Sequence, residues 1–426
     1  MTKYDPHEVR EIDVSSFNTA NIGPYSPGEN TADQKVGSMN MMFALTGSVV
    51  RDGKETDPSK SNHYRTVYKF GDDFVITSNC STKFMFLYAK SDTLDLSNID
   101  VSEATDLSFT FALCNAPTLD LSAWGSADKL VSTQYMFALY GMIGVALEKQ
   151  MTFTVKLGSS DNKFKLYYQK PLSNEYTDTD TKGMFFVPGF TQLDLTNVDI
   201  SKRKSLSRMF EFTILPVAAA QSSSTLATNK ALNISTWSTS NISDFSYMFA
   251  ISFIPGITLP TAENFKTATS GAKLDYMFML SYTTQMTDQY PSGLDLSNFD
   301  VSNATSTKAM FYAYAFVIPM NFQANNIPVV KFGNYNMTKL KDASWMFALS
   351  SFSVDISGLS ASAVQNLEYM FAFTGLNPYE RFLYLILQKR DNTKDVNEEI
   401  VPLGDKIGAF YTEITLPPTT KEGKAS

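Results

Sequence analysis

The side chains best suited to chemistry in this sequence are the aspartates of a recurring Leu-Asp-Leu segment. Asp95 and Asp120 each lie between alternating leucines, so we expect them to project from neighbouring parallel strands roughly 4.8 Å apart. Paired carboxylates can bind calcium or act as an acid and base pair. The interpretation we prefer is a solvated polar position, because Lys331 occupies the same slot between the segments of Asp295 and Asp355. That arrangement predicts cross-strand charge pairing.

Other reactive side chains are scarce. The chain has two histidines, His7 and His63, and neither sits in a motif that would orient a catalytic triad or a metal centre. Glycine-rich phosphate-binding motifs are also missing, and no groove with paired acidic residues suggests a carbohydrate-active enzyme. Cys80 and Cys114 are expected to be buried free thiols. We therefore expect no catalytic residue, no cofactor and no metal, and a protein that is not an enzyme.

Composition limits the classes of partner. The chain has 426 residues and a net charge of −8, so it offers no positive field for a phosphate backbone and nucleic acid is not an expected partner. No signal peptide is visible, and no apolar run approaches the ~20 residues of a membrane span, which predicts no membrane insertion. Apolar residues make up 43% of the chain, which is enough for a large core. This length usually implies several domains or repeats.

A repeat runs through most of the sequence. Nine-residue segments that begin at Leu94, Leu193 and Leu294 match almost letter for letter, and a phenylalanine follows the first leucine of each by 17 residues. Weaker copies begin at Ile12, Leu119, Leu232, Val330 and Val354. Where no insertion intervenes, the step from one phenylalanine to the next is 24–26 residues, within the range of leucine-rich repeats. The eleven anchors are Phe43, Phe86, Phe111, Phe137, Phe185, Phe210, Phe249, Phe278, Phe311, Phe347 and Phe371.

Each unit reads as a strand followed by a helix. Leu94 and Leu96 alternate with Asp95, as in a short strand with one buried face. Ser102 is a suitable helix N-cap, and Leu107 and Phe111 lie four residues apart, which predicts a helical stripe that ends at the anchor. The expected fold class is thus an α/β repeat that stacks strand–turn–helix units.

The segment Leu294–Phe311, with its Leu-Asp-Leu-Ser-Asn start and Met-Phe end, resembles the BspA-like leucine-rich repeat proteins, in the subtype common in mycoplasmas and lactobacilli. The resemblance covers roughly residues 10–375. It implies a right-handed leucine-rich-repeat solenoid of about eleven coils with one parallel β-sheet, displayed on bacterial surfaces for adhesion. Similar repeats occur in large viruses and phages. The family usually has a cysteine shortly after the anchor, whereas here only Cys114 stands there.

The domain organisation follows from the repeat and its interruptions. The solenoid is expected over 1–375, a helical cap over 376–416 and a flexible tail over 417–426. Asn377-Pro378 is a typical helix start, and a cap would cover the last coil. Few residues precede the first strand, so a partner or an upstream region is expected to cover the N-terminal end. The insertions lie near 18–37, 48–66, 141–182, 215–230 and 282–293.

The insertion at 141–182 carries the predicted binding site. Met151–Leu157 and Phe164–Tyr168 alternate in polarity and predict a β-hairpin, although part of this insertion could instead be the strand of the unit that ends at Phe185. Large amphipathic rings beside charges are typical of interfaces. The hypothesised binding residues are Tyr167, Tyr168, Tyr176, Lys165 and Lys170.

These observations predict a non-enzymatic binding protein, namely a segment of a bacterial cell-surface adhesin. Its partner would be a protein or glycan on a host cell, on extracellular matrix or on a particle. The expected location is the cell surface or the medium. The alternative is a structural or decoration protein of a virus or phage, located in the virion.

Overall fold

The structure is a computed structural model, and it divides into two compact units. Unit 1 comprises Met1–Arg203, Thr213–Gln221 and Ala231–Trp237. Unit 2 comprises Lys204–Phe212, Ser222–Lys230 and Ser238–Ser426. The residues described are 10–20, 22, 37–46, 66–78, 80–91, 93–141, 153–190, 192–215, 232–286, 291–315, 329–333, 335–350, 353–355, 359–360, 362–372, 374 and 414–415.

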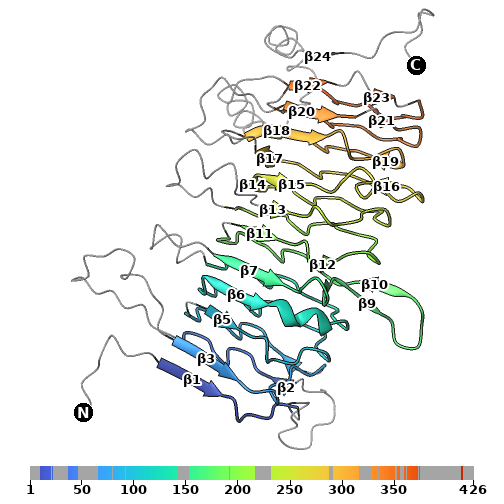
Figure 1. The fold of residues 1–426 in the computed structure, drawn as a ribbon. Coiled ribbons are helices and arrows are strands. Elements are labelled where there is room, and N and C mark those ends of the chain that lie inside the picture. The colour runs from blue at the N-terminus through green and yellow to red at the C-terminus, as the bar shows by residue number, and fades with distance from the viewer. Residues whose placement is uncertain are drawn as a thin grey trace, which may run out of the picture. The chain divides into compact units, whose positions relative to one another are not determined.

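Short strands that pair mostly in parallel make up unit 1 (Figure 1). Its parallel pairs are β1 with β3, β2 with β4, β5 with β6, β6 with β7, β8 with β12 and β11 with β13, whereas β9 and β10 are antiparallel. The strands are β1 (Arg10–Val14), β2 (Gly37–Ser38), β3 (Thr66–Phe70), β4 (Cys80–Ser81), β5 (Thr93–Asp95), β6 (Thr118–Leu121), β7 (Thr154–Leu157), β8 (Phe164–Lys165), β9 (Tyr167–Gln169), β10 (Tyr176–Asp178), β11 (Leu193–Asp194), β12 (Val198–Asp199) and β13 (Leu232–Asn233).

Unit 2 is built from the same kind of strand. Its largest sheet has the order β14-β17-β18-β20-β22-β24, and β16 pairs with β19 and β21 with β23 in parallel. Within the large sheet only β17 and β18 are antiparallel. The strands are β14 (Phe253–Pro255), β15 (Ile257–Thr258), β16 (Ala272–Lys273), β17 (Tyr282–Met286), β18 (Pro291–Leu296), β19 (Ala304–Ser306), β20 (Val329–Phe332), β21 (Tyr335–Asn336), β22 (Ser353–Asp355), β23 (Leu359–Ser360) and β24 (Ile414–Thr415).

The strand leucines of successive repeats lie in register. Leu94 pairs with Leu119 in unit 1, and both side chains are buried. In the same unit Leu193 pairs with the likewise buried Leu232. In unit 2, Leu294 pairs with Val330, which in turn pairs with Val354. The predicted register is confirmed at these pairs, because each repeat places its Leu-Asp-Leu segment beside that of the next.

The predicted helix before each anchor is wrong. Around Phe111 the chain makes two tight turns, because Phe109 and Leu113 adopt left-handed φ angles of 59° and 58°. The N–H of Phe111 donates to the carbonyl of Met136 in the next coil at 3.0 Å, so it is not available for a helical bond. Two left-handed residues, two before and two after the phenylalanine, recur at the other anchors up to Phe347, and Phe371 has the preceding one at Tyr369. Within the described residues the one helix is the 3₁₀ turn η1 (Ser122–Ser126).

The anchors stack as ladders of rings inside each unit. In unit 1 the centroids of successive rings lie 5.2–5.7 Å apart, and in unit 2 they lie 5.2–5.9 Å apart, with the planes nearly parallel. Parallel rings at such distances gain from offset stacking as well as burial. The ladders run Phe43, Phe86, Phe111, Phe137, Phe185 in unit 1 and Phe210, Phe249, Phe278, Phe311, Phe347, Phe371 in unit 2.

The hairpin predicted from Met151–Leu157 and Phe164–Tyr168 is wrong in its pairing. Strand β7 lies parallel to β6, with Val155 opposite Leu119, so it is the repeat strand of the unit that ends at Phe185, as the alternative interpretation held. Strand β8 pairs in parallel with β12. Gly158, with a φ of +65°, turns the chain after β7, and a Cβ at Gly158 would lie 2.5 Å from the backbone nitrogen of Phe164.

Several sequence predictions lie outside the described residues. These are the cap helix from Asn377 to Arg390, nearly all of the 376–416 cap, the tail 417–426, and almost all of the insertions 48–66 and 215–230.

Candidate functional site

The antiparallel pair β9 and β10 projects from the side of unit 1 (Figure 1). This hairpin pairs Tyr176 with Gln169 and Asp178 with Tyr167, and it lies between the repeat segments rather than within a coil. It contains four of the five predicted binding residues, because Lys165 belongs to β8 just before it. Within the predicted 141–182 insertion, Phe164 and Leu166 are buried core residues.

Tyr167 ties the hairpin to the coil beneath it. Its side chain is buried, and its hydroxyl donates a hydrogen bond of 2.7 Å to Oδ2 of Asp199. Burial raises the pKa of Tyr167 to about 12, so the phenol stays protonated and keeps this donor. Burial opposes ionisation of Asp199, but the N–H of Ser201 and the Tyr167 hydroxyl outweigh it and lower the pKa of that carboxyl. Tyr167 therefore supports the hairpin, and its buried side chain is not presented to solvent.

Arg203 closes the base of the hairpin. Its side chain is 3% exposed, and Nη1 donates to the carbonyl oxygens of Leu166 at 2.8 Å and Thr179 at 2.9 Å. These two carbonyls stand just before β9 and just after β10. Nη2 donates to Oγ1 of Thr181 at 3.3 Å. Burial lowers the pKa of Arg203 to about 10, which leaves the guanidinium charged at neutral pH. A buried cation is thus satisfied by the two ends of the hairpin it holds.

The exposed part of the hairpin is its tip and the ring of Tyr176. The tip is closed by an ion pair of 3.0 Å between Lys170 and Glu175 and by a backbone bond from the N–H of Lys170 to the carbonyl of Glu175. Leu172 is fully exposed in a left-handed conformation. Tyr176 is 40% exposed and packs edge-on against Tyr167. An apolar tip on a tethered hairpin is a suitable contact element.

A hollow of about 570 Å³ lies between this tip and the turn that follows η1. Asp128 and Lys129 line one side of it, and residues 169–174 line the other. Lys129 is ion-paired with Glu103 and Lys165 lies 3.7 Å from Asp128, so the charges on that side are largely matched. The hollow therefore has a mainly polar lining with little net charge, and Pro171 and Leu172 are its apolar side chains.

The five predicted binding residues differ in exposure. Tyr176 is exposed, Tyr168 is half-buried and Tyr167 is buried. Lys165 and Lys170 both lie beside a carboxylate. Sequence reasoning missed Arg203, although a signal exists: Ala104 and Ala304 occupy the equivalent position of the matching repeats, and both are fully buried. An arginine where the repeat requires a buried alanine indicates a local partner.

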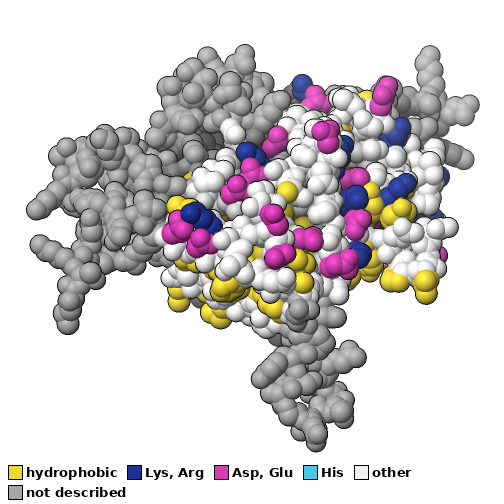
Figure 2. Space-filling view, turned by 60° about the horizontal axis from the view of Figure 1, so that its bottom comes forward, with side chains coloured by type: hydrophobic (Ala, Val, Ile, Leu, Met, Phe, Trp, Pro, Cys, Tyr) yellow, Lys and Arg dark blue, Asp and Glu magenta, His cyan; other side chains and the backbone are white. Residues whose placement is uncertain are grey.

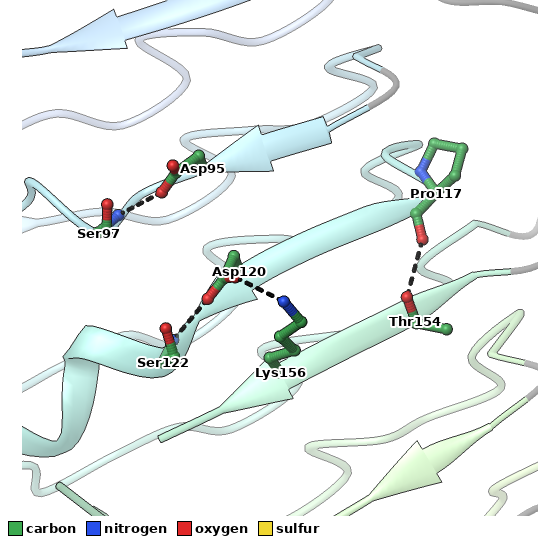
Figure 3. Close-up of polar contacts among 7 residues, drawn as sticks. All are labelled: Asp95, Ser97, Pro117, Asp120, Ser122, Thr154 and Lys156. Carbon is green, nitrogen blue, oxygen red and sulfur yellow. Dashed lines mark hydrogen bonds and ion pairs between the residues drawn. The ribbon is translucent and has the colours of Figure 1, made fainter. Parts of the chain in front are cut away.

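The repeated aspartates have a structural role. The carboxylate of Asp95 accepts the N–H of Ser97 at 2.9 Å, and that of Asp120 accepts the N–H of Ser122 at 3.0 Å (Figure 3). Each aspartate thus closes the turn that follows its strand. Asp120 also forms an ion pair of 3.0 Å with Lys156, its neighbour on β7, so the predicted cross-strand charge pairing occurs here.

The other side chains considered for catalysis or metal binding form no such site among the described residues. Both cysteines are free and buried, as predicted, and burial raises the pKa of Cys114 to about 12. The part of the chain that the structure describes contains no group of three or more His, Cys, Asp or Glu side chains arranged to hold a metal ion. His7 and His63 lie outside it. Among the same residues, none forms a helix with the length and hydrophobicity needed to cross a membrane.

Comparison with known proteins gives one match. A family model described as "Mycoplasma protein of unknown function, DUF285" matches residues 34–145, 218–332 and 318–377, which together make up more than half of the chain. No curated protein and no solved structure matches the chain. The matched segments contain nine of the eleven anchors and leave out Phe185 and Phe210.

Proposed function

Because the chain belongs to the DUF285 family of mycoplasma proteins of unknown function, we propose that it is a non-enzymatic binding protein, a segment of a cell-surface adhesin of the BspA-like repeat type. The observation that carries the proposal is the anchored hairpin β9–β10. Arg203 and Tyr167 fix its base, while Leu172 and Tyr176 are presented to solvent. An exposed apolar and aromatic contact on a rigid support binds with little loss of conformational entropy.

We also propose that the coils form a right-handed solenoid of the leucine-rich-repeat type. Support comes from the parallel register of successive Leu-Asp-Leu segments and from the ring ladders within each unit. Connections between adjacent parallel strands are right-handed in nearly all proteins. Tight turns take the place that helices have in other solenoids of this type. An experimental structure in which coils fail to stack one repeat at a time would reject this proposal.

The partner of the hairpin is expected to be a macromolecule on a host cell or in extracellular matrix. Acidic and basic side chains are interspersed on the face drawn in Figure 2, and the net charge is −8. Such a surface does not favour a polyanion. Recognition would instead depend on the shape of the tip and on its apolar side chains.

The test removes the tip and keeps the base. Gln169 and Tyr176 are paired, so residues 170–175 can be replaced by Asn-Gly, a two-residue turn suited to a hairpin. The Arg203 contacts and the buried Phe164 and Leu166 stay intact, unlike in a deletion of the whole 158–180 segment. We expect unchanged thermal unfolding and attachment to host cells or matrix weakened by at least about tenfold.

Point variants sharpen the test. Leu172→Ser and Tyr176→Ser should each weaken attachment, whereas Val131→Ser, at a 45% exposed position outside the hairpin, should not. Full attachment by the Asn-Gly variant would refute the hairpin as the binding element. If the chain instead bound virus or phage particles and not cells, the alternative function as a virion component would be favoured over an adhesin.

A further inference from the structure

Unit 2 carries a row of aromatic side chains at its surface, separate from the hairpin. Tyr247, Tyr276, Trp345 and Tyr369 each stand two residues before an anchor, and all four are half-buried. The rings of Tyr247 and Tyr276 stack with centroids 4.7 Å apart, and those of Trp345 and Tyr369 lie 4.5 Å apart. The spacing is that of the coils, so the row is periodic.

The coil in the middle of the row has its aromatic ring at a different sequence position. Ala309 occupies the position two residues before Phe311, where its neighbours have rings. Tyr312 lies one residue after that anchor and packs edge-on against Trp345 at 6.1 Å. Burial, and then the nearby Tyr276, raises the pKa of Tyr312. We call Tyr247, Tyr276, Tyr312, Trp345 and Tyr369 the aromatic row.

The polar ends of four of these rings lack a hydrogen-bond partner among the residues that the structure describes. Neither the hydroxyls of Tyr247, Tyr276 and Tyr312 nor the indole N–H of Trp345 makes a hydrogen bond to any described residue. The row therefore offers apolar ring edges together with a series of hydrogen-bonding groups. Half-buried tyrosine and tryptophan with free polar ends are typical of binding surfaces.

The backbone of the row excludes one mode of binding. The N–H groups of Tyr247, Tyr276 and Trp345 donate to Asp275, Lys308 and Glu368 of the next coil at 2.9–3.0 Å. A peptide therefore cannot bind here by strand addition, which needs free backbone groups. Arg208, which lies over the ring of Tyr247, is paired with Glu211, so the charge of this guanidinium is already balanced.

We propose that the aromatic row binds a neutral glycan chain. A periodic row of rings and hydroxyls suits a ligand that is itself a periodic polymer, has apolar ring faces and offers hydroxyls as donors and acceptors. A neutral polysaccharide has all three properties. This proposal does not depend on the hairpin, which lies in unit 1.

The experiment titrates the full chain with cello-, chito- and malto-oligosaccharides of increasing length, with heparin as the anionic comparison. Trp345 is a built-in probe, because the other two tryptophans, Trp124 and Trp237, are at most 1% exposed. Binding at the row should shift tryptophan fluorescence, and Trp345→Phe should remove that signal. Affinity should rise with chain length as more coils are contacted.

Conservative variants keep the fold intact. The double variant Tyr247→Phe, Tyr276→Phe retains both rings and removes two hydroxyls, and we expect it to weaken glycan binding by at least about tenfold. Tyr135→Phe, at the equivalent position of unit 1, should leave binding unchanged.

Two results would overturn the proposal. The first is that none of the neutral oligosaccharides binds to the folded chain, or that heparin binds in their place. The second is that the double variant loses attachment to a protein partner while the chain binds no glycan, which would make the row a protein interface.

Discussion

At the residue scale, the repeated aspartate is a turn-closing group. Its carboxylate accepts the N–H two residues later in coil after coil, for example the N–H of Ser297 at Asp295. A second aspartate, five residues further along the repeat, does the same, and Asp300 accepts the N–H of Ser302 at 2.9 Å. Asn233 and Asn366 make the same contact with an amide oxygen, so the acceptor matters more than the charge. The role of these side chains is therefore to close turns, although in sequence they resemble a catalytic or calcium-binding set.

The first prediction separates acceptor from charge. Asp300→Asn should change the free energy of unfolding by only a few tenths of a kcal/mol, whereas Asp300→Ala should lower it by about 1 kcal/mol because the turn N–H loses its partner. Urea unfolding of the two variants measures the difference. Equal stability of the alanine and asparagine variants would show that the turn forms without the side chain.

The second prediction concerns acid. Burial opposes ionisation of Asp120, but Ser122 and then Lys156 outweigh it, so the folded pKa lies below the ordinary value of 3.8. A depressed carboxyl pKa adds stability above the unfolded value, and that stability is lost as pH falls through the folded value. Unfolding temperature should therefore drop below about pH 4. Asp120→Asn should show a shallower drop, and an identical acid profile in both proteins would contradict the assignment.

At the scale of elements, the hairpin depends on one buried cation. Arg203 joins Leu166 and Thr179, which flank β9 and β10. We expect Arg203→Ala to cost roughly 2–4 kcal/mol, because two buried carbonyls lose a charged donor. Amide exchange should rise in residues 166–179. Lys83→Ala, at an exposed position of unit 1 outside the hairpin, is the control and should leave exchange there unchanged.

The sequence predicted some elements well and others poorly for identifiable reasons. The register of Leu94 with Leu119 follows from alternation in near-identical segments. The helix before Phe111 was wrong because apolar residues four apart also fit two tight turns, and non-glycine residues such as Phe109 gave no sign of left-handed φ. Strand β7 was found but its partner was not, since alternation does not specify which neighbour a strand joins. The sequence could not distinguish the buried Tyr167 from the exposed Tyr176, because the burial of Tyr167 depends on contacts with residues distant in sequence, such as Asp199.

At the scale of the whole molecule, stability is distributed along ladders of neighbouring coils. Phe311 is fully buried between Phe278 at 5.2 Å and Phe347 at 5.9 Å. Phe311→Ala should cost about 3–5 kcal/mol through lost burial and the cavity left between rings. Because repeats are stabilised mainly by their neighbours, unfolding should also become less cooperative. Calorimetry measures both effects. A free energy of unfolding within a few tenths of a kcal/mol of the wild-type value would place this ring outside the core.

The left-handed residues beside each anchor have a further consequence. Side chains as different as Met41, Arg208 and Ala309 adopt this backbone, with φ angles of 57°, 60° and 51°. The coil therefore does not demand glycine there, although a left-handed residue costs roughly 1–2 kcal/mol. The backbone therefore tolerates many side chains at these positions, while the ring between them fills the core. The surface of a coil can thus change in chemistry without a change in the interior that holds the coils together.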